Sequence, residues 1–205
     1  MNTHYLSSLF TPKSVVLFGA SDKQDSVGGV VFRNLLTSGF KGRIFAINPK
    51  RDEVQGQKAY STLEEIDEAV DLAVVATPAK SIPGIVEECG EHGVKMMLIL
   101  SAGFRETGAE GRRLEDQVTQ LVRRHGIRLM GPNCLGIIRP DRGLNITFGN
   151  NNAQPGSLAF VSQSGAICTA ILDWAEKNDI GFSAVVSTGI AADPVSYTHL
   201  RAHET

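Results

Sequence analysis

Three clusters of small residues follow short apolar runs and have the composition of phosphate-binding turns. They are Gly19-Ala20-Ser21, Ala76-Thr77-Pro78 and Ser101-Ala102-Gly103. Small residues allow backbone N–H groups and helix N-termini to approach an anion closely. Two further clusters, Gly131-Pro132-Asn133-Cys134 and Ser162-Gln163-Ser164-Gly165, also follow apolar runs. This arrangement predicts a site for a phosphate-rich cofactor at one edge of a sheet.

The segments between these clusters alternate between strand-like and helix-like patterns. Apolar runs predict strands at 14–18, 43–47, 71–76, 94–100 and 127–130. Helical spacing predicts helices at 27–37, 80–92 and 109–125, each followed within two residues by a glycine. The alternation predicts an α/β fold with a Rossmann-like, doubly wound parallel sheet, which we assign to residues 1–150.

A second, flavodoxin-like α/β domain is expected to begin near residue 156. Residues 143–155 are rich in Asn and Gly, lack periodicity and are expected to form a linker. A strand at 157–161, a helix at 166–177 and a strand at 182–187 predict a βαβ opening over residues 156–193. Two strands and a helix cannot close a core, so the chain is expected to be truncated. Residues 194–205 depart from this pattern, resemble a translated sequencing adapter, and are excluded from functional reasoning.

Composition excludes several classes of partner. The 205 residues carry a net charge of −2 and 42% hydrophobic side chains, which gives no reason to expect nucleic acid or an anionic membrane. No apolar run approaches the ~20 residues that span a bilayer, and the N-terminus lacks a signal peptide pattern. The three cysteines are widely spaced and form no metal-binding motif. We expect a cytoplasmic protein with a small-molecule ligand and no metal.

The turns after the first and second predicted strands narrow the choice of cofactor. The first turn, from Gly19 to Gly29, is longer than the G-x-G-x-x-G fingerprint of dinucleotide-binding folds. The second strand is followed by Asn48-Pro49-Lys50-Arg51, where NAD-binding folds place an acidic residue. Two cations predict an extra phosphate on the ribose, which NADP and coenzyme A (CoA) both carry. A solvated turn is the alternative for Lys50 and Arg51.

The motifs, taken in order, are similar to those of a known enzyme family. They are Thr11-Pro12-Lys13-Ser14-Val15, Gly19-Ala20-Ser21, Asn34-Leu35-Leu36, Ile47-Asn48-Pro49-Lys50, Asp71-Leu72-Ala73-Val74, Ser101-Ala102-Gly103-Phe104, Gly131-Pro132-Asn133-Cys134-Leu135-Gly136, Ser162-Gln163-Ser164-Gly165-Ala166 and Ile171-Leu172-Asp173-Trp174-Ala175. Over residues 8–193 the chain resembles the N-terminal part of the NDP-forming acyl-CoA synthetase family, which includes ADP-forming acetyl-CoA synthetase. It is more distantly similar to the succinyl-CoA synthetase alpha subunit.

This resemblance implies CoA as the cofactor and assigns roles to individual residues. The implied binding residues are Gly19, Ala20 and Ser21, with Val27 and Gly28 in the same turn, for phosphate; Asn48, Pro49 and Lys50 for the ribose and its 3′-phosphate; Ala76, Thr77 and Pro78 for the path of adenine and pantetheine; and Ser101, Ala102, Gly103 and Asn133 for the thiol end. The implied parent reaction joins an acid to CoA with ATP, giving acyl-CoA, ADP and phosphate through an acyl phosphate and a phosphohistidine.

The resemblance also implies that the catalytic parts lie elsewhere in the parent protein. The family's phosphorylated histidine belongs to a His-Thr-Gly-type loop late in the second domain, and His4, His92 and His125 do not match it. The ATP-grasp part that binds ATP or ADP is absent from the sequence, so it would belong to another domain or subunit. We therefore predict a CoA-binding module of a ligase, inactive alone and without catalytic residues. The alternatives are part of a protein lysine acetyltransferase fusion, a non-catalytic CoA-sensing module and an NADP-dependent oxidoreductase.

Three further residues allow a functional and a structural interpretation. Cys134 is either a reactive thiol in the cleft or, as we expect, a small packed residue. Trp174 is expected to pack in the core of the second domain. Ser164, or Ser162 two residues before it, either caps the helix that follows or helps to bind an anion there, and local chemistry supports both.

Overall fold

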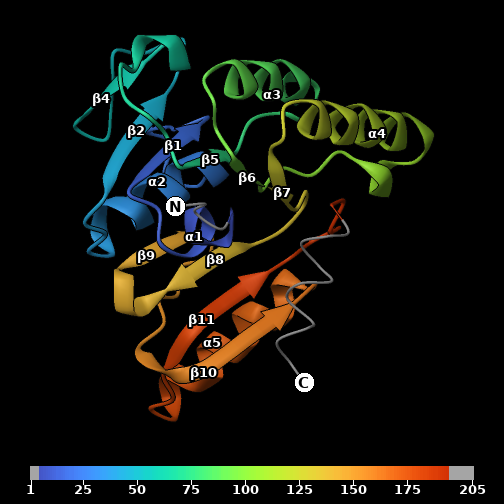
Figure 1. Ribbon diagram of the computed structural model, residues 1–205. Coiled ribbons are helices and arrows are strands. Elements are labelled where there is room, and N and C mark those ends of the chain that lie inside the picture. The colour runs from blue at the N-terminus through green and yellow to red at the C-terminus, as the bar shows by residue number, and fades with distance from the viewer. Residues whose placement is uncertain (1–4, 194–205) are drawn as a thin grey trace.

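The larger of two sheets carries the strands that the sequence predicts for the first domain. The computed structural model describes residues 5–193. The strands of this sheet are β1 (Ser14–Phe18), β2 (Arg43–Ile47), β3 (Glu53–Val54), β4 (Gln57–Tyr60), β5 (Leu72–Val75), β6 (Met96–Ile99) and β7 (Arg128–Met130). They lie in the order β3-β4-β2-β1-β5-β6-β7 (Figure 1). Neighbouring strands are parallel except for β3 and β4. The predicted Rossmann-like α/β fold is confirmed.

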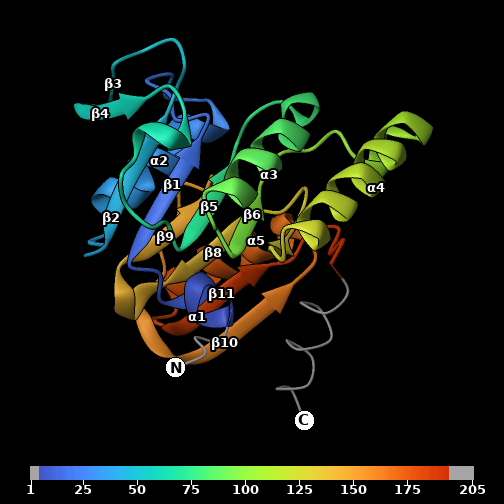
Figure 2. The same cartoon turned by 45° about the horizontal axis from the view of Figure 1, so that its top comes forward.

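Helices cover both faces of this sheet. They are α1 (Tyr5–Phe10), α2 (Val27–Thr37), α3 (Ile82–Glu91) and α4 (Ala109–Arg124), with short 3₁₀ turns η1 (Leu63–Glu65), η2 (Ala79–Ser81) and η3 (Arg105–Thr107). Successive residues of β1 point to opposite faces. Leu17 therefore packs with α1 and α2, whereas Val16 packs with α3 and α4. Figure 2 shows α3 and α4 side by side on their face of the sheet. Burial on both faces explains why β1 is apolar after its first residue, Ser14.

A second sheet contains the predicted βαβ unit together with a hairpin. Its elements are β8 (Gly136–Arg139), η4 (Pro140–Arg142), β9 (Leu144–Thr147), β10 (Pro155–Ser162), α5 (Gly165–Lys177) and β11 (Phe182–Ser187). The strand order is β10-β11-β8-β9, with β10 and β11 parallel and β8 antiparallel to both of its neighbours. Ile137 and Val186 join the core beneath α2, whereas Ile138 and Val185 pack against α5. The second sheet thus lies between the first sheet's helical layer and α5.

The hairpin of β8 and β9 corrects one sequence expectation. The predicted linker at 143–155 is wrong for Leu144–Thr147, which form a fully buried strand. The side-chain amide of Asn34 on α2 donates to the carbonyl oxygens of Thr147 and Gly149, at 2.8 and 2.9 Å. Four residues flanked by Asn and Gly are too few to display a strand period, so tertiary contacts with α2 decide this structure.

Helix α5 and the edge strand β10 of the second sheet leave apolar side chains uncovered. Trp174 was expected in the core but is 53% exposed, so that prediction is wrong. The buried residues of α5 are Cys168, Leu172 and Ala175, and Trp174 lies on the opposite side of the helix. Leu158 on the edge strand β10 is also 53% exposed. The βαβ segment therefore both packs on the first part, through β11 and β8, and leaves an apolar edge at β10.

Two negative observations apply to residues 5–193. No helix in this range is long and apolar enough to cross a lipid bilayer. The same residues contain no group of three or more His, Cys, Asp or Glu side chains placed to hold a metal ion. Our interpretation of residues 194–205 as a foreign tail lies outside the described range.

Candidate functional site

A cavity of about 780 Å³ opens at the carboxyl ends of β1, β2, β5 and β6. The chain leaves β1 through α2 to reach β2 on one side, whereas β5 pairs with β1 on the other side. The strand order therefore reverses at β1. Open parallel sheets bind their ligands at such a point because the two diverging connections leave a crevice.

Most of the predicted binding residues line this cavity. They are Gly19, Ala20, Ser21, Val27, Gly28, Asn48, Pro49, Lys50, Ala76, Thr77, Pro78, Ser101 and Ala102. Gly103 instead lines an adjoining cavity, which shares Pro78 and Ala102 with the first. Asn133 lines neither cavity, although its N–H donates to the carbonyl oxygen of Ser101 at 3.0 Å. The structure thus brings together the predicted residues of four strand ends.

The first turn is held close to α2 by two glycines. Gly19 has φ +88°, a conformation that side chains disfavour. A Cβ atom at Gly28 would lie 1.8 Å from the carbonyl oxygen of Gly19, so only glycine permits this approach. Ser26 caps α2 by accepting the N–H of Gly29 at 3.1 Å. The first N–H groups of a helix lack intrahelical acceptors, and Val27 and Gly28 of this turn line the cavity. The turn can therefore bind an anion.

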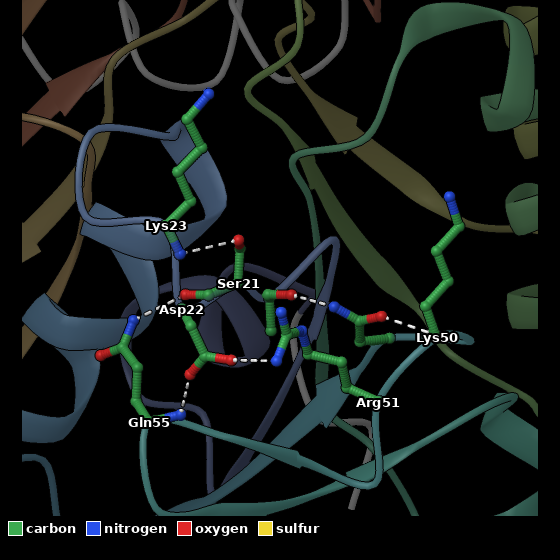
Figure 3. Close-up of polar contacts among 8 residues, drawn as sticks. Ser21, Asp22, Lys23, Lys50, Arg51 and Gln55 are labelled. Atoms are coloured by element: carbon green, nitrogen blue, oxygen red, sulfur yellow. Dashed lines mark hydrogen bonds and ion pairs between the residues drawn. The ribbon is translucent and has the colours of Figure 1, made fainter.

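Gln55, between β3 and β4, fastens this turn from outside the cavity. Its side-chain amide donates to the carbonyl oxygens of Ser21 and Gly29, at 2.8 and 2.9 Å. Its backbone N–H donates to the carboxylate of Asp22 at 2.7 Å (Figure 3). A single side chain therefore joins both ends of the first turn. No sequence motif indicated this role, since it depends on β4 pairing beside β2.

We expect Gln55→Ala to lower the free energy of unfolding by about 1–2 kcal/mol, because two hydrogen bonds to backbone carbonyls are lost. Urea unfolding followed by circular dichroism measures the change. Gln57→Ala is the matched control, since Gln57 is exposed on β4 only two residues away. Equal losses in the two variants would contradict the role assigned to Gln55.

The two cations after β2 have different surroundings. Arg51 forms an ion pair with Asp22, with 3.3 Å between the guanidinium and carboxylate atoms. Lys50 has no ion-pair partner among the described residues, and its side chain extends away from these contacts (Figure 3). Asn48 donates from its amide to the carbonyl of Ala20 at 2.8 Å and accepts the N–H of Lys50 at 3.0 Å. Of these two cations, Lys50 is therefore the one available to bind a ligand. The two hydrogen bonds of Asn48 connect the backbone of Lys50 to the first turn.

Comparison with known proteins shows the family to which this chain belongs. The family model described as a CoA binding domain matches residues 13–140, which contain all four strand ends of the cavity. The chain belongs to the CoA-binding domain family. A second model, the succinyl-CoA ligase like flavodoxin domain, matches residues 155–202. The two matches confirm the resemblance found from the sequence motifs.

Individual relatives of this CoA-binding chain are CoA ligases. The alpha subunit of ADP-forming acetate–CoA ligase I of Pyrococcus furiosus is 43% identical over 92% of this chain and 42% of its own length. The ADP-forming 4-hydroxybutyrate–CoA ligase of Nitrosopumilus maritimus is 40% identical over 89% of this chain and 26% of its own. The chain therefore spans less than half the length of these relatives.

A solved structure has the same arrangement as this CoA-binding chain. It is the dinucleotide forming acetyl-coenzyme A synthetase 1 of Ca. Korarchaeum cryptofilum, in complex with phosphate and ADP. The two align with a TM-score of 0.87 and 36% identity, over 94% of this chain and 40% of that one.

Several cavity residues of the CoA-binding domain were not predicted. They are Phe18, Ser26, Ile47, Ser61, Ser81, Ile85 and Glu88. Ser81, Ile85 and Glu88 follow one another at intervals of four and three residues, the spacing of one face of a helix. That signal is present in the sequence, but it is the same as the signal for a helix face packed in the core.

The surroundings of four residues, Cys134, His92, His125 and Ser164, indicate structural roles. Cys134 is 3% exposed, and burial raises the pKa of its thiol to about 12, so it is a packed, protonated residue. His92 and His125 lie at the C-terminal caps of α3 and α4, as their positions before glycines indicated. Ser164 caps α5 by accepting the N–H of Ile167 at 3.3 Å. These observations favour the structural interpretation for each residue.

Proposed function

We propose that this chain binds CoA in the cavity at β1, with the phosphates at the first turn of α2. The observation that carries the proposal is the glycine-lined turn beside Lys50, which has no ion-pair partner within residues 5–193, in a chain of the CoA-binding domain family. The turn supplies N–H donors for the diphosphate, and Lys50 supplies a cation for the 3′-phosphate of the ribose. The pantetheine arm runs past Thr77 and Ser101 toward Gly103, and Asn133 supports that end through Ser101.

The longer protein is proposed to be an ADP-forming acyl-CoA ligase. Relatives with comparable identity to this chain are named for acetate and for 4-hydroxybutyrate. Since both names share CoA and differ in the acid, the matched part is suited to the shared cofactor. ATP or ADP binds outside residues 5–193, in an ATP-grasp domain or partner subunit of the longer protein. We assign residues 1–150 to the CoA-binding domain and residues 156–193 to the beginning of the succinyl-CoA-ligase-like domain.

Calorimetric titration of the full chain with CoA, NADPH and ATP in parallel tests this function. We expect binding heat from CoA, and none from NADPH or ATP at the same concentrations. A melting temperature raised by NADPH but not by millimolar CoA would contradict the proposal. A mixture of acetate, ATP and CoA should yield no acetyl-CoA with this chain alone, because the histidines within residues 5–193, His92 and His125, occupy helix caps and do not line the cavity, so neither is placed to carry a phosphoryl group there.

A further inference from the structure

Glu88 is an acidic residue in a cavity that otherwise suits an anion. Among the described residues that line this cavity, it is the only Asp or Glu. It lies on α3 and is half-buried. The backbone N–H of Leu63 donates to its Oε1 atom. No described residue donates to Oε2, so the carboxylate is fixed in place and keeps an acceptor for a ligand.

Glu88 lies at the nucleoside side of the cavity. Leu63 begins η1, two residues after Ser61, which lines the cavity and follows β4. Since β4 pairs with β2, the contact between Glu88 and Leu63 places the carboxylate near the β2 end. The β6 end, lined by Ser101, is separated from β2 by two strands, β1 and β5.

The chemistry of this region suits a planar base with a donor group. Ile47 and Pro49 line the cavity at the β2 end, and Ile85 lines it one helical turn before Glu88 on α3, so all three offer apolar surface to a ring. A carboxylate repels phosphate, so it must face a neutral donor. The ribose hydroxyl lies beside the 3′-phosphate and is a poor partner for that reason. The pantetheine amides run toward β6.

We infer that Glu88 accepts a hydrogen bond from the 6-amino group of the adenine of CoA and so selects the base. This inference rests on the proposed function, because it assumes CoA in the cavity. Glu88 and Lys50 then recognise different parts of the nucleoside. The Lys50 ammonium binds the 3′-phosphate, and the Glu88 carboxylate accepts a hydrogen bond from the base. Neither residue need touch the reacting thiol.

The test compares CoA with an analogue in which hydrogen replaces the 6-amino group of adenine. Titration of the full chain should give an affinity about ten- to hundredfold lower for the analogue, since a hydrogen bond to a charged acceptor is lost. In Glu88→Gln the amide oxygen can still accept from Leu63, which leaves an NH₂ group facing the adenine amine. The variant should therefore lose affinity for CoA and bind the two ligands about equally.

Glu65→Gln is the matched control, because Glu65 accepts the N–H of Ser61 from the same segment without lining the cavity. It should keep the wild-type preference for CoA over the analogue. Equal affinities of the wild-type chain for both ligands would overturn the inference alone, even if Glu88→Gln did not fold. Failure of CoA to bind the wild-type chain would overturn the proposed function and this inference with it.

Discussion

Gly28→Ala is expected to weaken CoA binding by about a hundredfold, because hydrogen bonds from the N–H groups of the first turn to a charged phosphate contribute about 1.5–3 kcal/mol and depend on the position of that turn. The added Cβ would lie 1.8 Å from the backbone carbonyl oxygen of Gly19, and because a Cβ position is fixed by its own backbone, no side-chain rotation relieves the clash. The first turn and the N-terminus of α2 must therefore separate. We also expect a loss of about 3 kcal/mol in the free energy of unfolding, at the upper end of overpacking costs. Titration calorimetry and urea unfolding measure the two effects.

Gly84→Ala supplies the control for this variant. Gly84 lies within α3, and no atom is within 4 Å of the position that its Cβ would take. Alanine there should raise the free energy of unfolding by about 0.5–1 kcal/mol, because the unfolded chain loses conformational freedom. CoA affinity should not change. If Gly28→Ala bound CoA as tightly as Gly84→Ala does, the phosphate site would not lie at the first turn.

Lys50→Ala is expected to weaken CoA by about 1.5–3 kcal/mol, the range for a charge-assisted contact with phosphate. Dephospho-CoA, which lacks the 3′-phosphate, should bind the variant and the wild-type chain almost equally. The physical reason is that Lys50 has no ion-pair partner among residues 5–193 and extends away from the contacts of the first turn (Figure 3). Parallel titrations with the two ligands at low salt measure the difference, since salt screens exposed charges.

Arg51→Ala distinguishes a specific contact from general positive charge. Arg51→Ala removes the same formal charge as Lys50→Ala, from the adjacent position. In the wild-type chain, however, the guanidinium of Arg51 is already paired with the carboxylate of Asp22. The variant should therefore retain most of the preference for CoA over dephospho-CoA. If Lys50→Ala weakened both ligands equally, Lys50 would not read the 3′-phosphate. If Arg51→Ala removed the preference instead, the assignment of the two cations would be reversed.

The sequence was most informative where burial alone determines the structure. The predicted ranges of β1, α2, β2 and β11 match the observed ones residue for residue. These strands are continuously apolar or nearly so, and Ser26 marks the beginning of α2 through its cap. Such elements carry their own signals. The short strands β3, β4, β8 and β9 were missed, because two to four residues carry little periodicity and their structure depends on pairing with other strands.

Some residues of the candidate site could likewise be predicted from the sequence, and others could not. Residues of the first turn and of the strand ends could be predicted, because in a parallel sheet these positions meet at one edge. The division of labour between Lys50 and Arg51 could not be predicted, since it depends on Asp22 lying across the turn. Glu88 was missed for a related reason. Its place beside the cavity depends on tertiary contacts such as the hydrogen bond from Leu63, which follows β4 and lies far from α3 in the sequence.

The hairpin of β8 and β9 connects the two sheets, and we expect them to unfold as one cooperative unit. Ile137 and Ile146 belong to the core beneath α2, while β8 also pairs along its length with β11. Unfolding of the first sheet with α2 would remove the contacts of the hairpin with α2, and unfolding of β11 would remove its pairing with β8. The two sheets should therefore unfold at the same temperature. A recombination junction at residue 150 would leave β8 without β11. Chimeras that exchange the second part between relatives should therefore carry the hairpin with it, and should keep the α2 residues that the hairpin covers.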